Sequence, residues 1–288
     1  LATIALLLLT GMGLFDAVCH GLTTVSTGGF STRSASVAGL WTPTLLALVP
    51  FMLIGAWPLT IYRRWRSEGV SALADSEQVR TLTALTVVWI AALTVIFATT
   101  DAGAGKGFGD ALFLGVSLQT GTGFTTVRPA ELSPLAKVVM LLPMNIGGSL
   151  GSTAGAIKIY RVLVLATLLR MTLFRVALRP NVVKPFLVGG RSLERDEVET
   201  VAAFVIGYLA LLGLSTACFV ASGRDPLNSF FECSSALGAS GFTVGLVSRA
   251  LPAWQKLVLT FNMWVGRVEI IPAALALYPP MWVRRRRK

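Results

Sequence analysis

Three segments of the chain have residue types and spacings that could bind a cation. They span residues 15–32, 109–126 and 227–244, and they align without gaps. Each begins with a polar residue, continues through a helix-compatible stretch, and ends in a small-residue run that closes with Gly-Phe. Glycine allows backbone angles and close approaches that a Cβ would exclude. A ring of backbone carbonyls from such loops can replace the water around a dehydrated monovalent ion.

The surrounding sequence predicts an all-α polytopic membrane protein. Hydrophobic residues make up 54% of the 288 residues and charged residues only 14%, with a mean hydropathy of +0.71. An ordinary soluble domain carries about 25% charged residues, so one globular core could not hide this apolar surface. Uncharged runs long enough to cross a bilayer lie at 34–62, 81–100, 138–157 and 200–222. Residues 1–12 look like the tail of another span, and 159–177 and 251–283 are apolar runs that carry charges.

The basic residues predict the orientation in the membrane. The net charge is +11, and clusters of Lys and Arg follow the apolar runs at 63–66, 170–184 and 284–288. By the positive-inside rule these clusters and the C-terminus face the cytoplasm, and the three glycine-rich segments face outside. The same juxtamembrane placement argues against nucleic acid as the partner.

The position of the glycine-rich segments between spans suggests re-entrant pore loops. A single Ser/Thr/Gly run is more often a turn or a helix contact. Three copies, each at the same offset from a polar helix start, favour a filter. Non-helical backbone survives at membrane depth only when it is buried in protein or lines a water-filled path. Each short helix would also direct the partially negative end of its dipole at the ion.

The span after the second segment contains a run that should break its helix. Residues 145–155 include four glycines, and Lys158 follows them. The run is not a phosphate-binding loop, because Ile157 precedes the lysine and no strand leads into it. A small-residue helix contact through Gly147 and Gly151 is the simpler alternative. We favour a break, because two apolar runs lie end to end here.

Arg267 lies inside the last apolar run. A charge within a span is costly and marks a functional site by default, although a structural ion pair with a neighbouring span is the alternative. Glu269 points to a different helix face, so we expect it to be a poor local partner. The single histidine and three cysteines without CxxC spacing predict no resident metal or cofactor. His20 and Cys19 are interpreted as packing residues.

Together these motifs resemble the membrane subunit of the Trk/Ktr/HKT superfamily of potassium transporters, nearest the bacterial Trk branch. The motifs that carry the resemblance lie at 10–20, 26–32, 120–126, 145–158 and 266–270. In that family, four span–pore-loop–span units surround one pseudo-fourfold pore. The resemblance implies a second unit at 1–66, a third at 67–180 and a fourth at 181–288. The first unit, and part of the first span of the second, are expected to be missing from the N-terminal side.

The resemblance implies potassium uptake through a selectivity filter. Its filter glycines would be Gly29, Gly123 and Gly241. The two residues before each glycine would supply carbonyls to the ion, namely Thr27, Gly28, Gly121, Thr122, Ala239 and Ser240. The third unit reads Thr-Gly-Thr-Gly, where Thr-Thr-Thr-Gly is expected of the Trk branch. This departure should loosen the local backbone and weaken the preference for potassium.

The resemblance also implies a gate and two kinds of partner. Segment 145–158 would be an intramembrane loop that obstructs the pore below the filter. The residues expected to act in gating are Asn145, Gly147, Gly148, Gly151, Ser152, Thr153, Lys158 and Arg267. The partners implied are a second copy, giving a homodimer in the cytoplasmic membrane, and a cytoplasmic nucleotide-binding ring. Segments 63–80 and 175–195 are the expected contacts of that ring, and the chain itself carries no dinucleotide-binding fingerprint.

Several functions stay open on the sequence alone. The transported ion is expected to be potassium, with sodium or unselective monovalent cation transport as the alternative. Without its first unit, this chain could instead be a non-conducting assembly subunit. A membrane enzyme is disfavoured, because one histidine and few intramembrane carboxylates supply no convergent catalytic set. A channel and a symporter are not distinguished.

Overall fold

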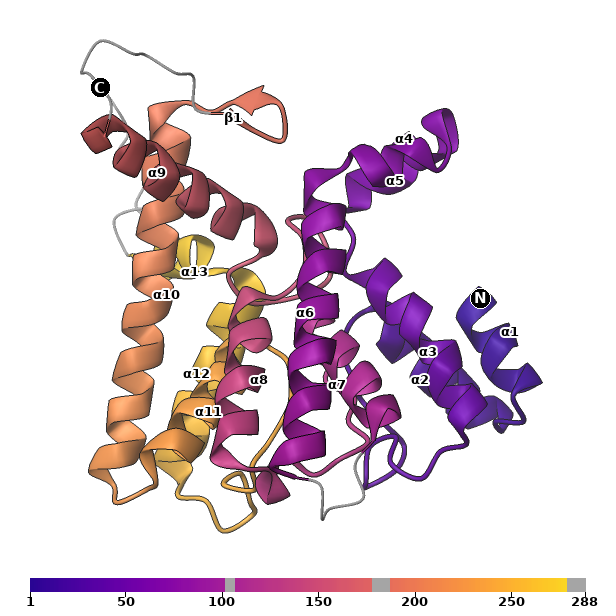
Figure 1. The fold of residues 1–288 in the computed structure, drawn as a ribbon. Helices are drawn as coiled ribbons and strands as arrows, with labels where there is room; N and C mark the ends of the chain where they lie inside the picture. Colours follow the sequence, from indigo (N-terminus) through magenta and orange to yellow (C-terminus); the bar gives the residue numbers. More distant parts are fainter. Residues whose placement is uncertain (102–106, 178–186, 279–288) are drawn as a thin grey trace, which may run out of the picture.

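A computed structural model describes residues 1–101, 107–177 and 187–278, which fold into helices that repeat one pattern three times (Figure 1). Each repeat is a helix, a helix of 12 or 13 residues that leads into a glycine loop, and a further helix. The first repeat comprises α1 (Ala2–Leu9), α2 (Leu14–Val25) and α3 (Thr42–Gly55). The second comprises α6 (Glu77–Thr99), α7 (Phe108–Thr120) and α8 (Pro134–Ile146). The third comprises α10 (Arg195–Ala221), α11 (Pro226–Leu237) and α12 (Ala253–Val268).

The remaining elements connect or extend these repeats. They are α4 (Leu59–Glu68), α5 (Ser71–Asp75), the 3-10 turn η2 (Pro129–Glu131), α9 (Ile159–Ala177) and α13 (Ile270–Ala276). Two short antiparallel strands, β1 (Leu187–Val188) and β2 (Arg191–Ser192), form a hairpin. The helices α4, α5 and α9 and the hairpin gather at the end of the molecule away from the glycine loops (Figure 1).

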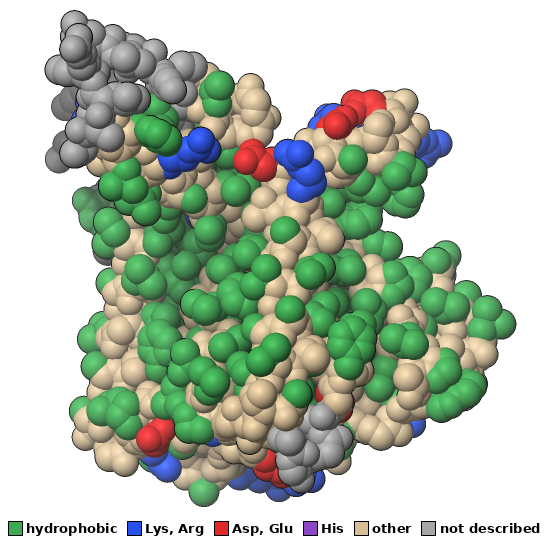
Figure 2. All heavy atoms as spheres, in the orientation of Figure 1, with side chains coloured by type: hydrophobic (Ala, Val, Ile, Leu, Met, Phe, Trp, Pro, Cys, Tyr) green, Lys and Arg blue, Asp and Glu red, His purple; other side chains and the backbone are tan. Residues whose placement is uncertain are grey.

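The long helices have the composition of membrane spans. Among the described residues, α6 and α10 are each long and apolar enough to cross a bilayer. Two bent pairs would raise the number to four, namely α3 with α4, bent by 95°, and α12 with α13, bent by 112°. Hydrophobic side chains cover the middle of the face in Figure 2, while charged side chains gather at its two ends. This distribution is that of a protein whose solvent is partly lipid.

The structure corrects one predicted span and confirms a predicted break. The run 34–62 is not one span, because residues 34–41 form turns and the helix bends sharply before α4. Pro58 precedes α4, and its missing N–H and fixed φ prevent a straight continuation. The run 138–157 breaks as expected, since α8 ends at Ile146 and Gly147 has a φ of +71°.

Buried clusters join each repeat to its neighbour. One cluster combines Leu7, Leu48 and Met52 of the first repeat with Phe113 and Phe124 of the second. A second cluster is built mainly from α6, α7 and α8, and it receives Phe231 and Phe242 of the third repeat. The three repeats therefore form one body that fixes the three glycine loops relative to one another.

Candidate functional site: an arc of three glycine loops

The three loops share one unusual backbone conformation. The first and third filter residues of each have positive φ: Thr27 (49°) and Gly29 (63°), Gly121 (66°) and Gly123 (91°), Ala239 (52°) and Gly241 (79°). The residue between them does not. Such alternation places successive N–H groups on one side of the chain and successive carbonyls on the other. Thr27 and Ala239 are not glycines, and the left-handed conformation costs such residues about 1–2 kcal/mol each. Strain repeated at equivalent positions is typical of a functional site.

The loops abut one another in a fixed order. A Cβ added to Gly29 would overlap the carbonyl oxygen of Thr122, and one added to Gly123 would overlap that of Ser240. A Cβ on Gly241 would meet nothing within 4 Å. Each filter glycine of the first two loops therefore lies against the carbonyl of the next loop. The glycine of the third loop faces open space, so the three loops form an arc and not a closed ring.

The burial of the phenylalanine after each filter glycine shows that the arc is also open at the first loop. Phe124 is fully buried in the cluster of the first repeat, and Phe242 is 3% exposed in the cluster of the second. Phe30, at the equivalent place in the first loop, is 75% exposed. Each phenylalanine thus packs into the preceding repeat, and for Phe30 the described residues contain no preceding repeat.

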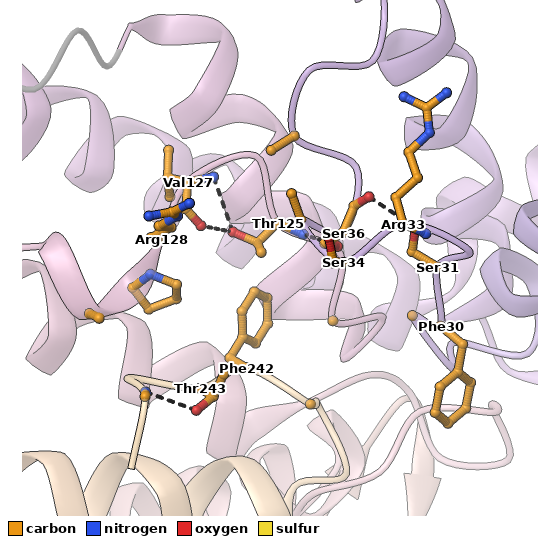
Figure 3. A pocket seen from close by; sticks show the side chains of 18 residues that line it. Phe30, Ser31, Arg33, Ser34, Ser36, Thr125, Val127, Arg128, Phe242 and Thr243 are labelled. Carbon is orange, nitrogen blue, oxygen red and sulfur yellow. Dashed lines mark hydrogen bonds between the residues drawn. The ribbon is translucent and has the colours of Figure 1, made fainter. Parts of the chain in front are cut away.

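A cavity opens on one side of the filter glycines (Figure 3). Its volume is about 530 Å³, and residues from all three loops line it, including Gly29, Gly123 and Gly241. Arg33 and Arg128 lie among the lining residues, and Arg128 pairs with Glu131 at 3.3 Å. This cavity, called the vestibule below, therefore opens directly onto the three glycines.

The broken segment after α8 lies on the opposite side of the arc. Thr27 Oγ1 donates to Thr153 Oγ1 at 3.2 Å. A Cβ on Gly121 would lie 3.8 Å from that of Ala154, and one on Gly155 would lie 2.5 Å from the carbonyl oxygen of Gly238. The segment therefore contacts the inner ends of all three loops, which places it directly beneath the filter.

Polar contacts hold this segment from several elements. Arg267 Nη1 donates to the carbonyl oxygen of Thr153 at 2.6 Å, so the predicted approach of Arg267 to the segment is seen. The Thr153 hydroxyl also donates to the carbonyl oxygen of Gly55 at 3.0 Å. Leu59 N donates to the carbonyl oxygen of Gly151 at 3.1 Å. Arg267 thus offers a hydrogen bond to the segment, and among the described residues no ion pair of Arg267 with a neighbouring span is seen.

The other residues expected to act in gating lie within the segment or at its ends. Asn145 Nδ2 donates to the carbonyl oxygen of Leu141 at 2.7 Å, and its Oδ1 accepts from Tyr208 Oη at 3.0 Å. Ser152 Oγ donates to the carbonyl oxygen of Ser149 at 2.7 Å. Gly148 is tightly enclosed, because a Cβ there would lie 2.7 Å from that of Ala154.

Lys158 makes a contact that the sequence did not indicate. Its Nζ lies 2.7 Å from Glu269 Oε1, and Arg161 Nη2 lies 2.5 Å from Glu269 Oε2. The side chains of Lys158 and Arg161 are each 11% exposed, and the Arg161 guanidinium lies 3.7 Å above the Phe204 ring. Glu269 is therefore a central partner, and it joins the end of segment 145–158 to the bend between α12 and α13.

Two glutamines and the histidine make contacts that the sequence did not predict. Gln119 Nε2 donates to the carbonyl oxygen of Gly147 at 2.6 Å, and Gln78 Oε1 accepts from Leu150 N at 2.9 Å. In the sequence, Gln119 is marked only by being an amide within an otherwise apolar helix, just before the second glycine loop. His20 is buried but does more than pack, because its Nε2 lies 2.9 Å from Ser31 Oγ in the loop beyond the filter.

Membrane-spanning helices, re-entrant half-helices and glycine loops that meet in an arc define a polytopic membrane protein of repeated pore-loop units. The chain belongs to the TrkH family of cation transport proteins, whose sequence profile matches residues 8–280. The fold class and the resemblance expected from the sequence are thus confirmed.

Individual relatives agree with this family. The chain is 29% identical to the Trk system potassium uptake protein TrkH of Salmonella typhimurium, over 94% of this chain and 58% of that protein. It is 28% identical to an uncharacterized cation transporter of Methanocaldococcus jannaschii, over 98% of this chain and 57% of that protein. The crystal structure of the potassium transporter TrkH from Vibrio parahaemolyticus matches with a TM-score of 0.87 and 29% identity, over 98% of this chain and 62% of that one. The chain therefore spans less than two thirds of the length of these relatives.

Proposed function

We propose that this chain forms most of the wall of a potassium uptake pathway across the cytoplasmic membrane. The main support is the arc of three loops, which share the same alternating backbone conformation. Where two loops meet, the filter glycine of one lies against a carbonyl of the next. Carbonyls held in this way can replace the hydration shell of a monovalent cation. The Salmonella and Vibrio relatives are named as potassium transporters, which favours potassium over sodium.

The two open ends of the arc support a ring of four loops. One further loop would bring a carbonyl to Gly241 and would offer a core for Phe30, which is 75% exposed. In this proposal the chain supplies three consecutive units, at 1–66, 67–180 and 181–288. Potassium is the cargo, held by the carbonyls of Thr27, Gly28, Gly121, Thr122, Ala239 and Ser240 next to the three filter glycines.

The segment 145–158 is proposed to gate this pathway. It lies under all three loops, and a cation leaving the filter would meet it before any cytoplasmic surface. Arg267, bonded to Thr153, adds positive charge near the path and so raises the barrier for a cation. We assign the vestibule to the outer face and the end with α4 and α9 to the cytoplasm, because basic residues cluster there on α4.

The proposed partners are a second copy and a cytoplasmic nucleotide-binding ring. The basic cluster 284–288 and part of the expected contact 175–195 lie outside the described residues. Within the described residues, Gly189 N of the hairpin donates to a carboxylate oxygen of Glu77. The adjacent Gln78 accepts a hydrogen bond from Leu150 N of segment 145–158. This short route is how a ring bound at the hairpin would act on the gate.

Selective transport tests the function directly. Full-length protein in liposomes should take up potassium in preference to sodium. Gly123→Ser should reduce that preference about tenfold or more, because its side chain would displace the Ser240 carbonyl. Gly213→Ala is the matched control, since it lies in α10 with open space around it and no positive φ. Equal potassium and sodium uptake by the parent would favour unselective transport, and absence of uptake would favour an assembly subunit.

A further inference from the structure

Two aspartates make the same contact behind the filter in the first two repeats. Asp16 Oδ1 accepts a hydrogen bond from Thr32 Oγ1 at 2.8 Å, and Asp110 Oδ1 accepts one from Thr126 Oγ1 at 2.6 Å. Each aspartate lies in the first turn of its half-helix, and each threonine lies three residues beyond the filter glycine. The contact ties the outer end of the filter loop to the outer start of the helix beside it.

The third repeat lacks both partners at the aligned positions. Asn228 and Val244 occur there, and Asn228 Oδ1 instead accepts from Lys137 Nζ at 3.3 Å. The contact is rebuilt one helical turn further along α11. Glu232 Oε1 accepts from Thr243 Oγ1 at 2.6 Å, from Val244 N at 2.9 Å and from Leu246 N at 3.2 Å.

The rebuilt contact is the most deeply buried of the three. Glu232 is 3% exposed, whereas Asp16 and Asp110 are only half-buried. A buried carboxylate is costly unless hydrogen bonds satisfy it, and bonds to an ionised acceptor are among the strong ones. Three donors from the segment just beyond Gly241 converge on a single oxygen. The Glu232 side chain therefore supplies the acceptor that the three donors of segment 243–246 need.

We propose that Glu232 is a positioning residue for the filter, which fixes the Gly241 loop as Asp16 and Asp110 fix the other two. The inference rests on the filter function proposed above. Carbonyls around a cation repel one another, so each loop needs a support on its outer side. Glu232 acts through Thr243 and the backbone of 244–246, and it does not touch the ion.

Removing the contact from either side should weaken selectivity without abolishing transport. In the full-length protein, Glu232→Ala should lower the ratio of potassium to sodium uptake about tenfold, since three donors lose their common acceptor. Thr243→Val keeps the shape and removes one donor, so a fall of roughly threefold is expected. Glu232→Gln keeps an acceptor oxygen and should restore most of the ratio. The double variant Glu232→Ala with Thr243→Val should have the same uptake ratio as Glu232→Ala alone, because the bond removed by Thr243→Val is already lost in Glu232→Ala.

Controls separate positioning from general stability and from the proposed function itself. Ser229→Ala is the matched control, because Ser229 is buried on the same helix and its Oγ has no partner within the described residues. If Glu232→Ala fails to fold, Thr243→Val carries the test. A selective parent whose folded Thr243→Val and Glu232→Ala variants keep the parent ratio would overturn the positioning role alone. A parent without any cation preference would overturn the filter function first.

Discussion

At the scale of single residues, Glu269 balances two cations within the membrane domain. It lies at a positive φ of 72° between α12 and α13, and it pairs with both Lys158 and Arg161. The prediction that Glu269 is a poor local partner of Arg267 agrees with these contacts, since Arg267 bonds the carbonyl oxygen of Thr153 instead. Breaking a buried ion pair leaves an uncompensated charge, which costs more than the pair contributes when intact.

Glu269→Ala should therefore strongly destabilise the protein. It leaves two cations that are each 11% exposed without their acceptor, a loss of about 3–5 kcal/mol in the free energy of unfolding. Thermal unfolding of the purified protein in detergent measures the effect. Glu68→Ala is the control, because the Glu68–Arg64 pair lies exposed on α4 and should leave the melting temperature nearly unchanged. Equal melting temperatures for the two variants would contradict the role given to Glu269.

Some site residues could be predicted from sequence and others could not. Gly29, Gly123 and Gly241 stood out because a positive φ and close backbone approach leave glycine as the favoured residue. Glu232 did not, because the aligned position holds Asn228 and the compensating pair moved by one helical turn. A shift of this kind is invisible to an ungapped comparison of repeats.

At the scale of elements, the existence of helices was predictable and their direction was not. Hydropathy detected the apolar runs that became α6 and α10, which start and end within a few residues of expectation. It gave no sign of the 95° bend between α3 and α4, because composition carries no information on direction. The break after α8 could be predicted, since the glycines of 147–155 oppose a helix whatever surrounds them.

Segment 145–158, the proposed gate, is the element whose shortening should change transport most. Arg267→Ala, or a deletion that shortens 147–155, should raise potassium flux through the full-length protein, because the obstruction and its positive charge are reduced. Dependence of the flux on the cytoplasmic partner should fall at the same time. Flux into liposomes and thermal stability must be measured together, since loss of Arg267 also removes a hydrogen bond. A well-folded shortened variant that conducts no faster than its parent would make the segment a structural break.

At the scale of the whole molecule, the three glycine loops of the described residues form an open arc. Residues 1–288 alone should not conduct potassium selectively, because the filter arc is open beside Gly241. Joining the N-terminal part of the Salmonella typhimurium relative to this chain should restore selective uptake. Liposome flux assays on the two proteins side by side provide the measurement, with Gly123→Ser in the joined protein as the control of reduced selectivity. Selective flux through residues 1–288 by themselves would show that three loops suffice or that copies complement one another.

The order in which the loops abut also gives the molecule a polarity. Each repeat presents a glycine face to the next repeat and inserts a phenylalanine into the preceding one, so the two surfaces of a junction are unlike. Unlike surfaces generate a ring when the rotation closes and an open chain of copies when it does not. Within the described residues, one surface of each kind is uncovered, at Phe30 and at Gly241. Separate copies of these repeats would be expected to meet head to tail at such surfaces, unless a further repeat of the same polypeptide covers both.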